Sequence, residues 1–270
     1  MLQINHVTFF GKALIYMAYS TERPTIHIAA GGNGTRIREG MDYLGFDTGF
    51  PKHLLPTGGG ETLLGRIVRQ AQKLGHVAIH ANYDNVRQIG ESSDIAPDVA
   101  LQIARNSNGP LSPVIHDILR TGERSFSSAG DYWADFEWTD FLAFHQEHDQ
   151  PVSILVGPSV PAKEGARFDV AEDGRVRSWE RVEKTTERDL INIGAYIIDP
   201  EKLVLKILRE MTWHKEDPFN DAMIEQGLMA AYALPTPAFN VNTPEVYASL
   251  IQHTSEKAIA SPLAVDTRED

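Results

Sequence analysis

The sequence contains no cysteine among its 270 residues. Disulfide bonds, thiolate metal sites and a cysteine nucleophile are therefore excluded. It also lacks the run of about 18 apolar residues that a membrane-spanning helix requires, because its apolar N-terminal stretches, 7–10 and 13–19, are much shorter. No basic segment or small-residue cleavage site accompanies these stretches, so we expect no secretory signal, no membrane partner and a cytoplasmic protein.

Positive charge is scarce, since 25 lysines and arginines stand against 37 aspartates and glutamates and give a net charge of −12. General binding to nucleic acid requires clustered lysine and arginine that displace counterions, so we expect no nucleic-acid partner. If the ligands are anionic, the fold must place its few cations locally against a repulsive overall field. The length is sufficient for a substantial hydrophobic core.

Strand-like and helical segments alternate through the first 160 residues. This alternation predicts an α/β fold with a Rossmann-like, mostly parallel sheet and helices on both faces. The helix at 112–119 is expected to begin with Ser112 as its N-cap and Pro113 at its first position. We expect strands at 26–30, 77–81, 99–104, 125–129 and 152–156, and helices at 61–74, 112–119 and 139–148.

The second half of the chain has a different pattern. Extended segments at 167–170 and 175–179 flank Glu172-Asp173-Gly174, which predicts a β-hairpin, and a further strand is expected at 191–198. We interpret this region as a small β-rich lid. No repeat or linker divides the chain, so we expect a single domain over 25–255. An N-terminal extension, 1–24, has no functional interpretation, and 256–270 is expected to form a C-terminal tail.

A glycine-rich turn follows the first predicted strand, with the sequence Ala30-Gly31-Gly32-Asn33-Gly34-Thr35-Arg36, and Lys52 stands sixteen positions beyond the arginine. Backbone N–H groups of such a turn, together with two cations, can surround a polyphosphate. A dinucleotide-binding fingerprint is excluded because Ile37 replaces its third glycine. A P-loop is excluded because Arg66-Ile67 replace the required lysine and hydroxyl residue.

The glycine-rich turn resembles the Ala-Gly-Gly-x-Gly-Thr-Arg-Leu signature of the sugar-phosphate nucleotidylyltransferase family, with Ile37 for the leucine. Residues 51–56, Pro-Lys-His-Leu-Leu-Pro, resemble that family's Pro-Lys-x-Leu-Leu-Pro. The resemblance covers about residues 25–250. Further matches follow in the family's order: Asn108-Gly109, Gly130-Asp131, Asp173-Gly174-Arg175-Val176, Glu183-Lys184, Ile191-Asn192-Ile193-Gly194-Ala195-Tyr196 and Asn242-Thr243-Pro244-Glu245.

The resemblance implies a fold of the nucleotide-diphospho-sugar transferase type, whose lid binds the acceptor. It implies transfer of a nucleoside monophosphate from a nucleoside triphosphate to a sugar 1-phosphate, with Mg²⁺ as cofactor. An acceptor phosphate oxygen attacks the α-phosphorus in line, a reaction that requires positioning and charge neutralisation more than a covalent nucleophile. Family members often assemble as dimers or tetramers, which makes a homo-oligomer an option, but the sequence identifies no interface.

The resemblance also assigns roles to individual residues. Arg36 would hold the departing pyrophosphate, Lys52 would bridge the acceptor phosphate and the α-phosphate, and Asp131 would bind Mg²⁺. The residues expected to bind the nucleotide are Ala30, Gly31, Gly32, Asn33, Gly34, Thr35, Arg36 and Gly109. The residues expected to bind the acceptor are Glu183, Lys184, Asn192 and Gly194.

Taken singly, these residues also fit ordinary structural roles. The glycines fit a tight turn, and Arg36 or Lys52 fits a solvated surface cation. Asp131 fits a cap at a strand end, and Glu183-Lys184 fits a charged edge strand.

Two positions depart from the family pattern. A metal-binding aspartate usually precedes Gly-Thr-Pro near the C-terminus, whereas this chain has Asn240-Val241-Asn242-Thr243-Pro244. An asparagine carbonyl can still bind Mg²⁺, and the sequence leaves both Asn240 and Asn242 open as the ligand. Ala104 stands where the family often has a base-reading glutamine, so neither base nor sugar is assigned. Two alternatives stay open: a non-catalytic nucleotide-sugar sensor of the same fold, and a nucleotidyltransferase acting on a non-sugar phosphate or phosphonate.

Histidines and aromatic residues gather around the predicted helix at 139–148. His145 and His148 lie three positions apart, but no third ligand stands nearby, so we predict a solvated helix end instead of a zinc site. The aromatic residues expected in the core are Trp133, Phe136, Trp138, Phe141 and Phe144.

Overall fold

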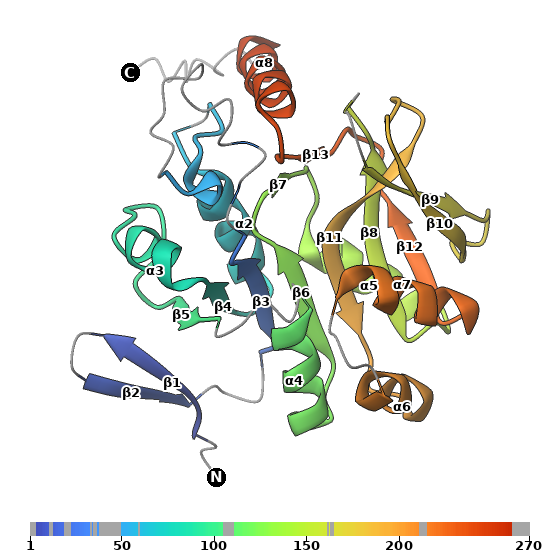
Figure 1. The fold of residues 1–270 in the computed structure, drawn as a ribbon, viewed down its shortest axis with the longest axis horizontal. Helices are drawn as coiled ribbons and strands as arrows, with labels where there is room; N and C mark the ends of the chain where they lie inside the picture. Colours follow the sequence, from blue (N-terminus) through green and yellow to red (C-terminus); the bar gives the residue numbers. More distant parts are fainter. Residues whose placement is uncertain are drawn as a thin grey trace, which may run out of the picture.

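The computed structural model describes residues 4–10, 13–18, 23–32, 34, 37, 50–58, 60–104, 111–160, 162, 165–210 and 215–260. A nine-stranded mixed sheet forms its centre (Figure 1). One half runs in the order β5 (Ala100–Ile103), β4 (His76–Ala81), β3 (Thr25–Ala30) and β6 (Ser125–Ala129), all parallel. The predicted α/β fold with a mostly parallel mixed sheet is confirmed.

The other half of the sheet begins at β11 (Leu190–Ile198), which pairs antiparallel with β6 and links the two halves. β11 also pairs antiparallel with β8 (Val152–Pro158), and β8 pairs in parallel with β12 (Met229–Ala233). The predicted hairpin is confirmed as β9 (Gly165–Val170) and β10 (Val176–Val182), and β9 joins the sheet through β11.

Alternation along the central strand divides its side chains between the two faces of the sheet. Ile26, Ile28 and Ala30 of β3 are fully buried in the largest hydrophobic cluster. α2 (Leu63–Gln72) and α5 (Trp138–Glu147) contribute apolar side chains to the same cluster. The opposite face of β3 presents His27 and Ala29, which line a cavity.

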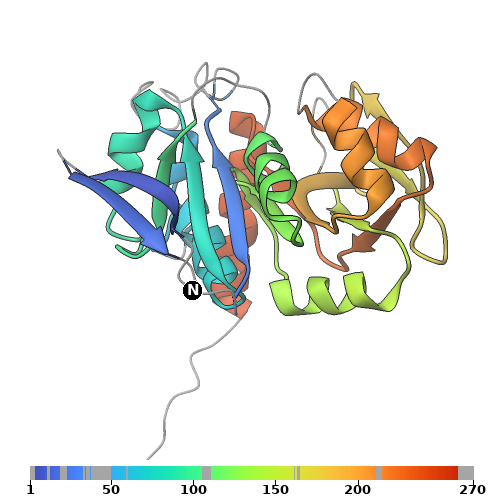
Figure 2. The same cartoon turned by 90° about the horizontal axis from the view of Figure 1, so that it is seen from below.

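Helices cover both faces of the sheet, as predicted. α4 (Ser112–Thr121), α6 (Lys202–Glu210) and α7 (Glu216–Glu225) share a second hydrophobic cluster with β8, β11 and β12. Figure 2 shows α4 and α5 on opposite sides of the sheet. α3 (Tyr83–Gly90) follows β4 and packs Ile89 into the first cluster. The predicted N-cap of α4 is wrong by one residue, because Leu111 caps the helix without a side-chain hydrogen bond.

The C-terminal part of the described chain returns to the sheet edge. β13 (Phe239–Asn240) pairs antiparallel with β7 (Tyr132–Trp133), and α8 (Pro244–Ala260) packs there through a third hydrophobic cluster. α8 continues past residue 255, so the expected start of the tail lies inside a helix. η2 (Lys52–Leu54) is a single short turn beside α2.

The N-terminal extension contains a separate antiparallel hairpin. β1 (Ile4–Phe10) pairs with β2 (Ala13–Ala18), and β1 lies beside β5 at the edge of the main sheet (Figures 1 and 2). Among the described residues, no helix combines the length and apolarity needed to span a membrane.

Candidate functional site

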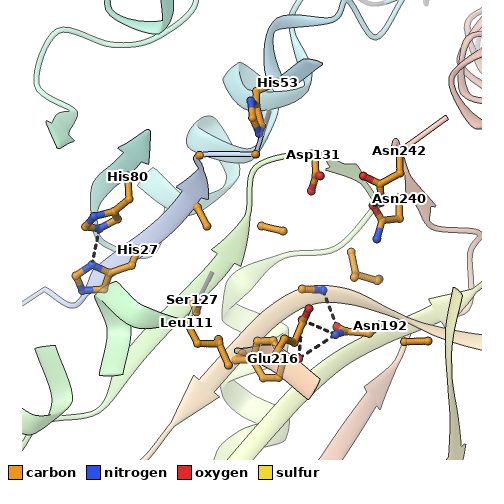
Figure 3. A pocket seen from close by; sticks show the side chains of 18 of the residues that line it. His27, His53, His80, Leu111, Ser127, Asp131, Asn192, Glu216, Asn240 and Asn242 are labelled. Atoms are coloured by element: carbon orange, nitrogen blue, oxygen red, sulfur yellow. Dashed lines mark hydrogen bonds between the residues drawn. The ribbon is translucent and has the colours of Figure 1, made fainter. Parts of the chain in front are cut away.

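A cavity of about 1160 Å³ lies at the carboxyl ends of the central strands (Figure 3). β3 and β6 are paired in parallel with Ala29 level with Ala129, so Gly31 and Asp131 leave the same edge of the sheet side by side. Ligands of open α/β sheets bind at this edge. The volume exceeds the roughly 300–1,000 Å³ of a typical small-molecule site, which leaves room for two substrates.

Lys52 lines the cavity and has only 8% of its surface exposed. Its Nζ forms an ion pair with Asp131 and donates a hydrogen bond to Asn242 Oδ1 at 2.8 Å. A Cβ placed on Gly32 would lie 3.6 Å from Lys52 Cε, so the lysine stem passes directly beside the glycine-rich turn. The surface-cation interpretation of Lys52 is therefore wrong.

Asp131 and His53 lie in the same buried environment, which affects the charge of each. Burial alone would raise the pKa of Asp131, but the charge of Lys52 and the hydrogen bond that Lys52 donates hold it below its ordinary value. Burial lowers the pKa of His53 from 6.5 to about 4, the carboxylate of Asp131 opposes this shift, and Lys52 adds to it. His53 is 1% exposed, and its Nδ1 has no hydrogen-bond partner among the described residues. An ionised carboxylate thus lies beside a neutral imidazole.

Asn240 and Asn242 reach the same place from the C-terminal part of the chain. β13 pairs Asn240 with Tyr132, and Val241 N donates to Asp131 O at 2.9 Å. Both asparagine side chains point toward the region of Asp131 (Figure 3). Asn242 Nδ2 donates to Asn240 Oδ1, which orients Asn242 Oδ1 toward Lys52.

The oxygen atoms of Asp131, Asn240 and Asn242 form a donor set that fits Mg²⁺. This ion prefers oxygen ligands and usually combines one or two protein carboxylates with substrate phosphates and water. The described chain contains no group of three histidine, aspartate or glutamate side chains that could hold a metal by themselves. The residues present therefore fit a metal shared with a phosphate ligand better than an all-protein metal cage.

Asn192 anchors the opposite end of the cavity. Its Oδ1 accepts from Gly194 N at 2.6 Å, and its Nδ2 donates to Tyr196 Oη at 2.8 Å and to Glu216 Oε1 at 2.6 Å. Tyr196 Oη also donates to Glu216 Oε1 at 2.8 Å. Burial raises the pKa of Glu216, although the hydrogen bonds from Tyr196 and Asn192 oppose that shift. Glu216 is a candidate functional residue that the sequence did not indicate, because no family match covers α7.

Gly194 is required by the close approach of β11 to β6. Its φ is +80°, a conformation that favours glycine, and an added Cβ would lie 2.7 Å from Ala129 Cβ. The backbone at Gly194 can therefore border the cavity only without a side chain.

The remaining predicted site residues lie in different surroundings. Gly31 and Gly32 line the cavity, whereas the side chain of Ala30 is fully buried in the core. Glu183 and Lys184 are exposed just after β10 and are absent from the cavity lining, where Arg181 stands instead, paired with Asp217 at 2.7 Å. Gly34 has a φ of 61°, a left-handed backbone conformation that favours glycine. Predicted residues outside the described part are Asn33, Thr35, Arg36 and Gly109.

Polar side chains also form the cavity floor beneath the glycine-rich turn. His27 Nδ1 lies 3.0 Å from His80 Nε2, and His27 Nε2 lies 3.4 Å from Asp117 Oδ2. Burial alone would raise the pKa of Asp117, but the hydrogen bonds and charges of His27 and Arg120 lower it to about 2. This face of the sheet therefore carries a hydrogen-bonded polar network.

His145 and His148 lie outside the cavity and have structural partners. His145 Nδ1 is 2.7 Å and His148 Nε2 is 2.9 Å from Ser153 Oγ, and His145 Nε2 is 3.2 Å from Asp199 Oδ2. His145 is buried, so the predicted solvated helix end is wrong for this residue. The aromatic core prediction is confirmed, with Trp138 and Phe141 fully buried.

No family model matches the sequence. The chain is 27% identical over 222 residues to mannose-1-phosphate guanylyltransferase 1 of Arabidopsis thaliana, which covers 78% of this chain and 59% of that protein. The chain thus spans less than two thirds of that relative's length.

Two solved structures share the fold. HddC from Yersinia pseudotuberculosis has a TM-score of 0.62 and 18% identity, over 86% of this chain and 99% of that one. A putative glucose-1-phosphate thymidylyltransferase from Bacillus anthracis has a TM-score of 0.66 and 13% identity, over 86% and 94% of the two chains. In sequence the chain is thus similar to sugar-phosphate nucleotidylyltransferases over most of its length, and these two structures show that it shares their fold.

Proposed function

We propose that this chain transfers a nucleoside monophosphate from a nucleoside triphosphate to a sugar 1-phosphate, giving a nucleoside-diphosphate sugar and pyrophosphate. The observation that carries the proposal is the buried ammonium of Lys52, beside Gly32 in a cavity that also contains the Asn192 cluster. The similarity to a mannose-1-phosphate guanylyltransferase supports this reaction class. HddC has been solved in complex with GMP-PN, which supports nucleotide binding by this fold.

In this proposal the reaction is an in-line displacement. An oxygen of the acceptor phosphate forms a bond to the α-phosphorus, while the bond from that phosphorus to the pyrophosphate oxygen breaks. The attacking oxygen is already anionic, so the step needs neither a covalent nucleophile nor a general base. What the protein supplies is alignment and compensation of charge.

Lys52 supplies a compact cation for the two phosphates that approach each other. Its burial makes the charge more effective than it would be in water, because the surrounding dielectric is lower. Gly32 lies beside Lys52, and Gly31 and Gly32 both line the cavity, where their backbone N–H groups would bind the triphosphate. Asp131, Asn240 and Asn242 would hold Mg²⁺, which neutralises phosphate charge when bound.

The Asn192 cluster favours an acceptor rich in hydroxyl groups. Asn192 and Tyr196 both bond to Glu216 Oε1, whereas Glu216 Oε2 has no hydrogen bond within the described part of the chain. A carboxylate oxygen accepts hydrogen bonds from sugar hydroxyls and repels a second anionic substituent. We therefore assign the acceptor end of the cavity to Asn192, Gly194, Tyr196 and Glu216, while roles for Glu183 and Lys184 stay predictions.

The proposal is tested by pyrophosphate release with Mg²⁺, the four common nucleoside triphosphates and a panel of sugar 1-phosphates. We expect turnover with at least one pair, and a loss of about 100-fold or more in kcat for Lys52→Ala, because a group that stabilises transferred charge contributes on this scale. Lys206→Ala is the matched control, since Lys206 is exposed on α6. Wild-type turnover by Lys52→Ala would refute the assignment of Lys52.

Asn240 and Asn242 give the sensor alternative a specific basis, since a neutral amide stands at either position in place of the family's usual carboxylate. Binding of a nucleotide sugar without turnover for any substrate pair would support the sensor and refute the enzyme. Turnover only with phosphocholine or a phosphonate would retain the reaction class and change the acceptor.

A further inference from the structure

The ammonium group of Lys52 lies between the side chains of Asp131 and Asn242, which would both have to coordinate a divalent cation. Its Nζ is ion-paired with Asp131 and is 2.8 Å from Asn242 Oδ1. Both oxygens belong to the donor set that fits Mg²⁺. The ammonium and a metal ion therefore compete for the same ligands.

The protein backbone holds this arrangement in place. Val241 N donates to Asp131 O, so the chain segment carrying Asn240 and Asn242 is fixed to the residue that pairs with Lys52. Asn242 N also donates to Asn240 O at 2.8 Å, and both amide side chains lie on the Asp131 side (Figure 3). Asn242 Nδ2 donates to Asn240 Oδ1 and leaves Asn242 Oδ1 as the acceptor for Lys52.

The charges in this group cancel. Lys52 contributes one positive charge, Asp131 one negative charge and the two asparagines none, so a free divalent cation meets no net negative site. It must also displace the ammonium from its carboxylate before it reaches Asp131. A triphosphate changes this balance, because its oxygens provide new partners for the ammonium and additional ligands for the metal.

We propose that Lys52 is the resident cation of the nucleotide-free site and excludes divalent metal from Asp131 until a triphosphate arrives and draws the ammonium away. Metal and triphosphate then bind together. The second half of this inference rests on the proposed function, whereas the exclusion of metal by Lys52 does not.

The test is Mn²⁺ binding without nucleotide, measured by electron paramagnetic resonance of the free ion. Mn²⁺ is suitable because it accepts the same oxygen ligands as Mg²⁺. Lys52→Met removes the charge and retains the stem, and we expect it to bind Mn²⁺ at least about tenfold more tightly than the wild type, since it leaves Asp131 without a nearby cation. Lys52→Arg, which keeps the charge, should bind as weakly as the wild type.

Lys206→Met is the matched control, because it removes one positive charge from an exposed position on α6 and should leave Mn²⁺ affinity unchanged. Thermal unfolding establishes that each variant is folded. Equal Mn²⁺ affinity of folded Lys52→Met and wild type would overturn the proposal. The wild type tests it independently of any variant, because tight, saturable Mn²⁺ binding without nucleotide would also overturn it.

Water proton relaxation then compares wild-type protein with Mn²⁺ alone and with Mn²⁺ plus a non-hydrolysable triphosphate analogue, since it distinguishes protein-bound metal from metal on free nucleotide. We expect strong enhancement only with the analogue. Enhancement of the same size without it would contradict the proposal. Failure of the transferase assay with these metal results intact would refute the proposed function and leave the role of Lys52 in metal exclusion standing.

Discussion

Replacing His53 with glutamine should reduce the loss of unfolding free energy that the protein undergoes as the pH falls. Burial lowers the pKa of His53 to about 4 in the folded protein, against 6.5 for an ordinary histidine, with Lys52 and Asp131 as the charged groups facing it. As the pH falls below 6.5, the unfolded chain takes up a proton that the folded protein does not. The free energy of unfolding must therefore fall between pH 6.5 and about 4.

The size of the effect follows from the difference between the two pKa values. Each unit corresponds to about 1.4 kcal/mol, so lowering the pH from 8 to 5 should cost the wild type about 2 kcal/mol through His53 alone. The full loss, about 3 kcal/mol, is reached below pH 4, where both states are protonated. Other titrating groups contribute equally to wild type and variant, so their effects cancel in the comparison.

The assay is urea unfolding of wild type and His53→Gln at pH 8 and pH 5. The variant should lose about 2 kcal/mol less than the wild type over this interval, whatever its stability at pH 8. His116→Gln is the control for the substitution itself, because it makes the same replacement at an exposed position of α4. If His53→Gln and wild type lose the same free energy, His53 is not held neutral by burial and the reasoning fails.

Two further substitutions examine the acceptor end of the cavity. Gly194→Ala should lower the free energy of unfolding by about 2 kcal/mol or more, because the added Cβ meets Ala129 and the φ is positive. Gly122→Ala is the control, because Gly122 has a φ of +68° and open surroundings, so its loss of unfolding free energy measures the backbone contribution alone. Equal losses for Gly194→Ala and Gly122→Ala in urea unfolding would contradict the predicted clash. Glu216→Gln should raise the KM for the acceptor about tenfold and change kcat less, since it weakens hydrogen bonds to bound hydroxyls. An unchanged KM in steady-state kinetics would remove Glu216 from the acceptor site.

The parallel half of the fold could be predicted because its signals are local. Apolar alternation identifies β3, and the apolar face of α2 followed by Gly75 identifies that helix. The meeting of Gly31 and Asp131 could also be anticipated, because both follow parallel strands that end at the same sheet edge.

Other parts depend on contacts that are distant in the sequence. Glu216 joins Asn192 from α7, a helix that carries Pro218 in its first turn and has no family match to mark it. His145 looked solvated because its partners, Ser153 on β8 and Asp199 after β11, lie on other elements. Patterns along one segment cannot show which polar groups another segment brings to it.

Each described cationic side chain of the cavity lining is paired with a carboxylate, and this pairing affects how an anionic substrate can bind. The described residues contribute three cationic side chains to the lining, and each is paired with a carboxylate: Lys52 with Asp131, Arg120 with Asp117 and Arg181 with Asp217. A chain with a net charge of −12 thus presents no uncompensated cation among these residues to a passing anion.

An anionic substrate must therefore exchange one of these carboxylates for its own phosphate. At Lys52 the exchange releases Asp131, a carboxylate that repels the incoming phosphate unless a metal ion neutralises it. A triphosphate that carries its own divalent cation satisfies both groups at once, because the phosphate receives the ammonium and the carboxylate receives the metal. The Lys52–Asp131 ion pair consequently favours a metal–triphosphate complex over either component alone.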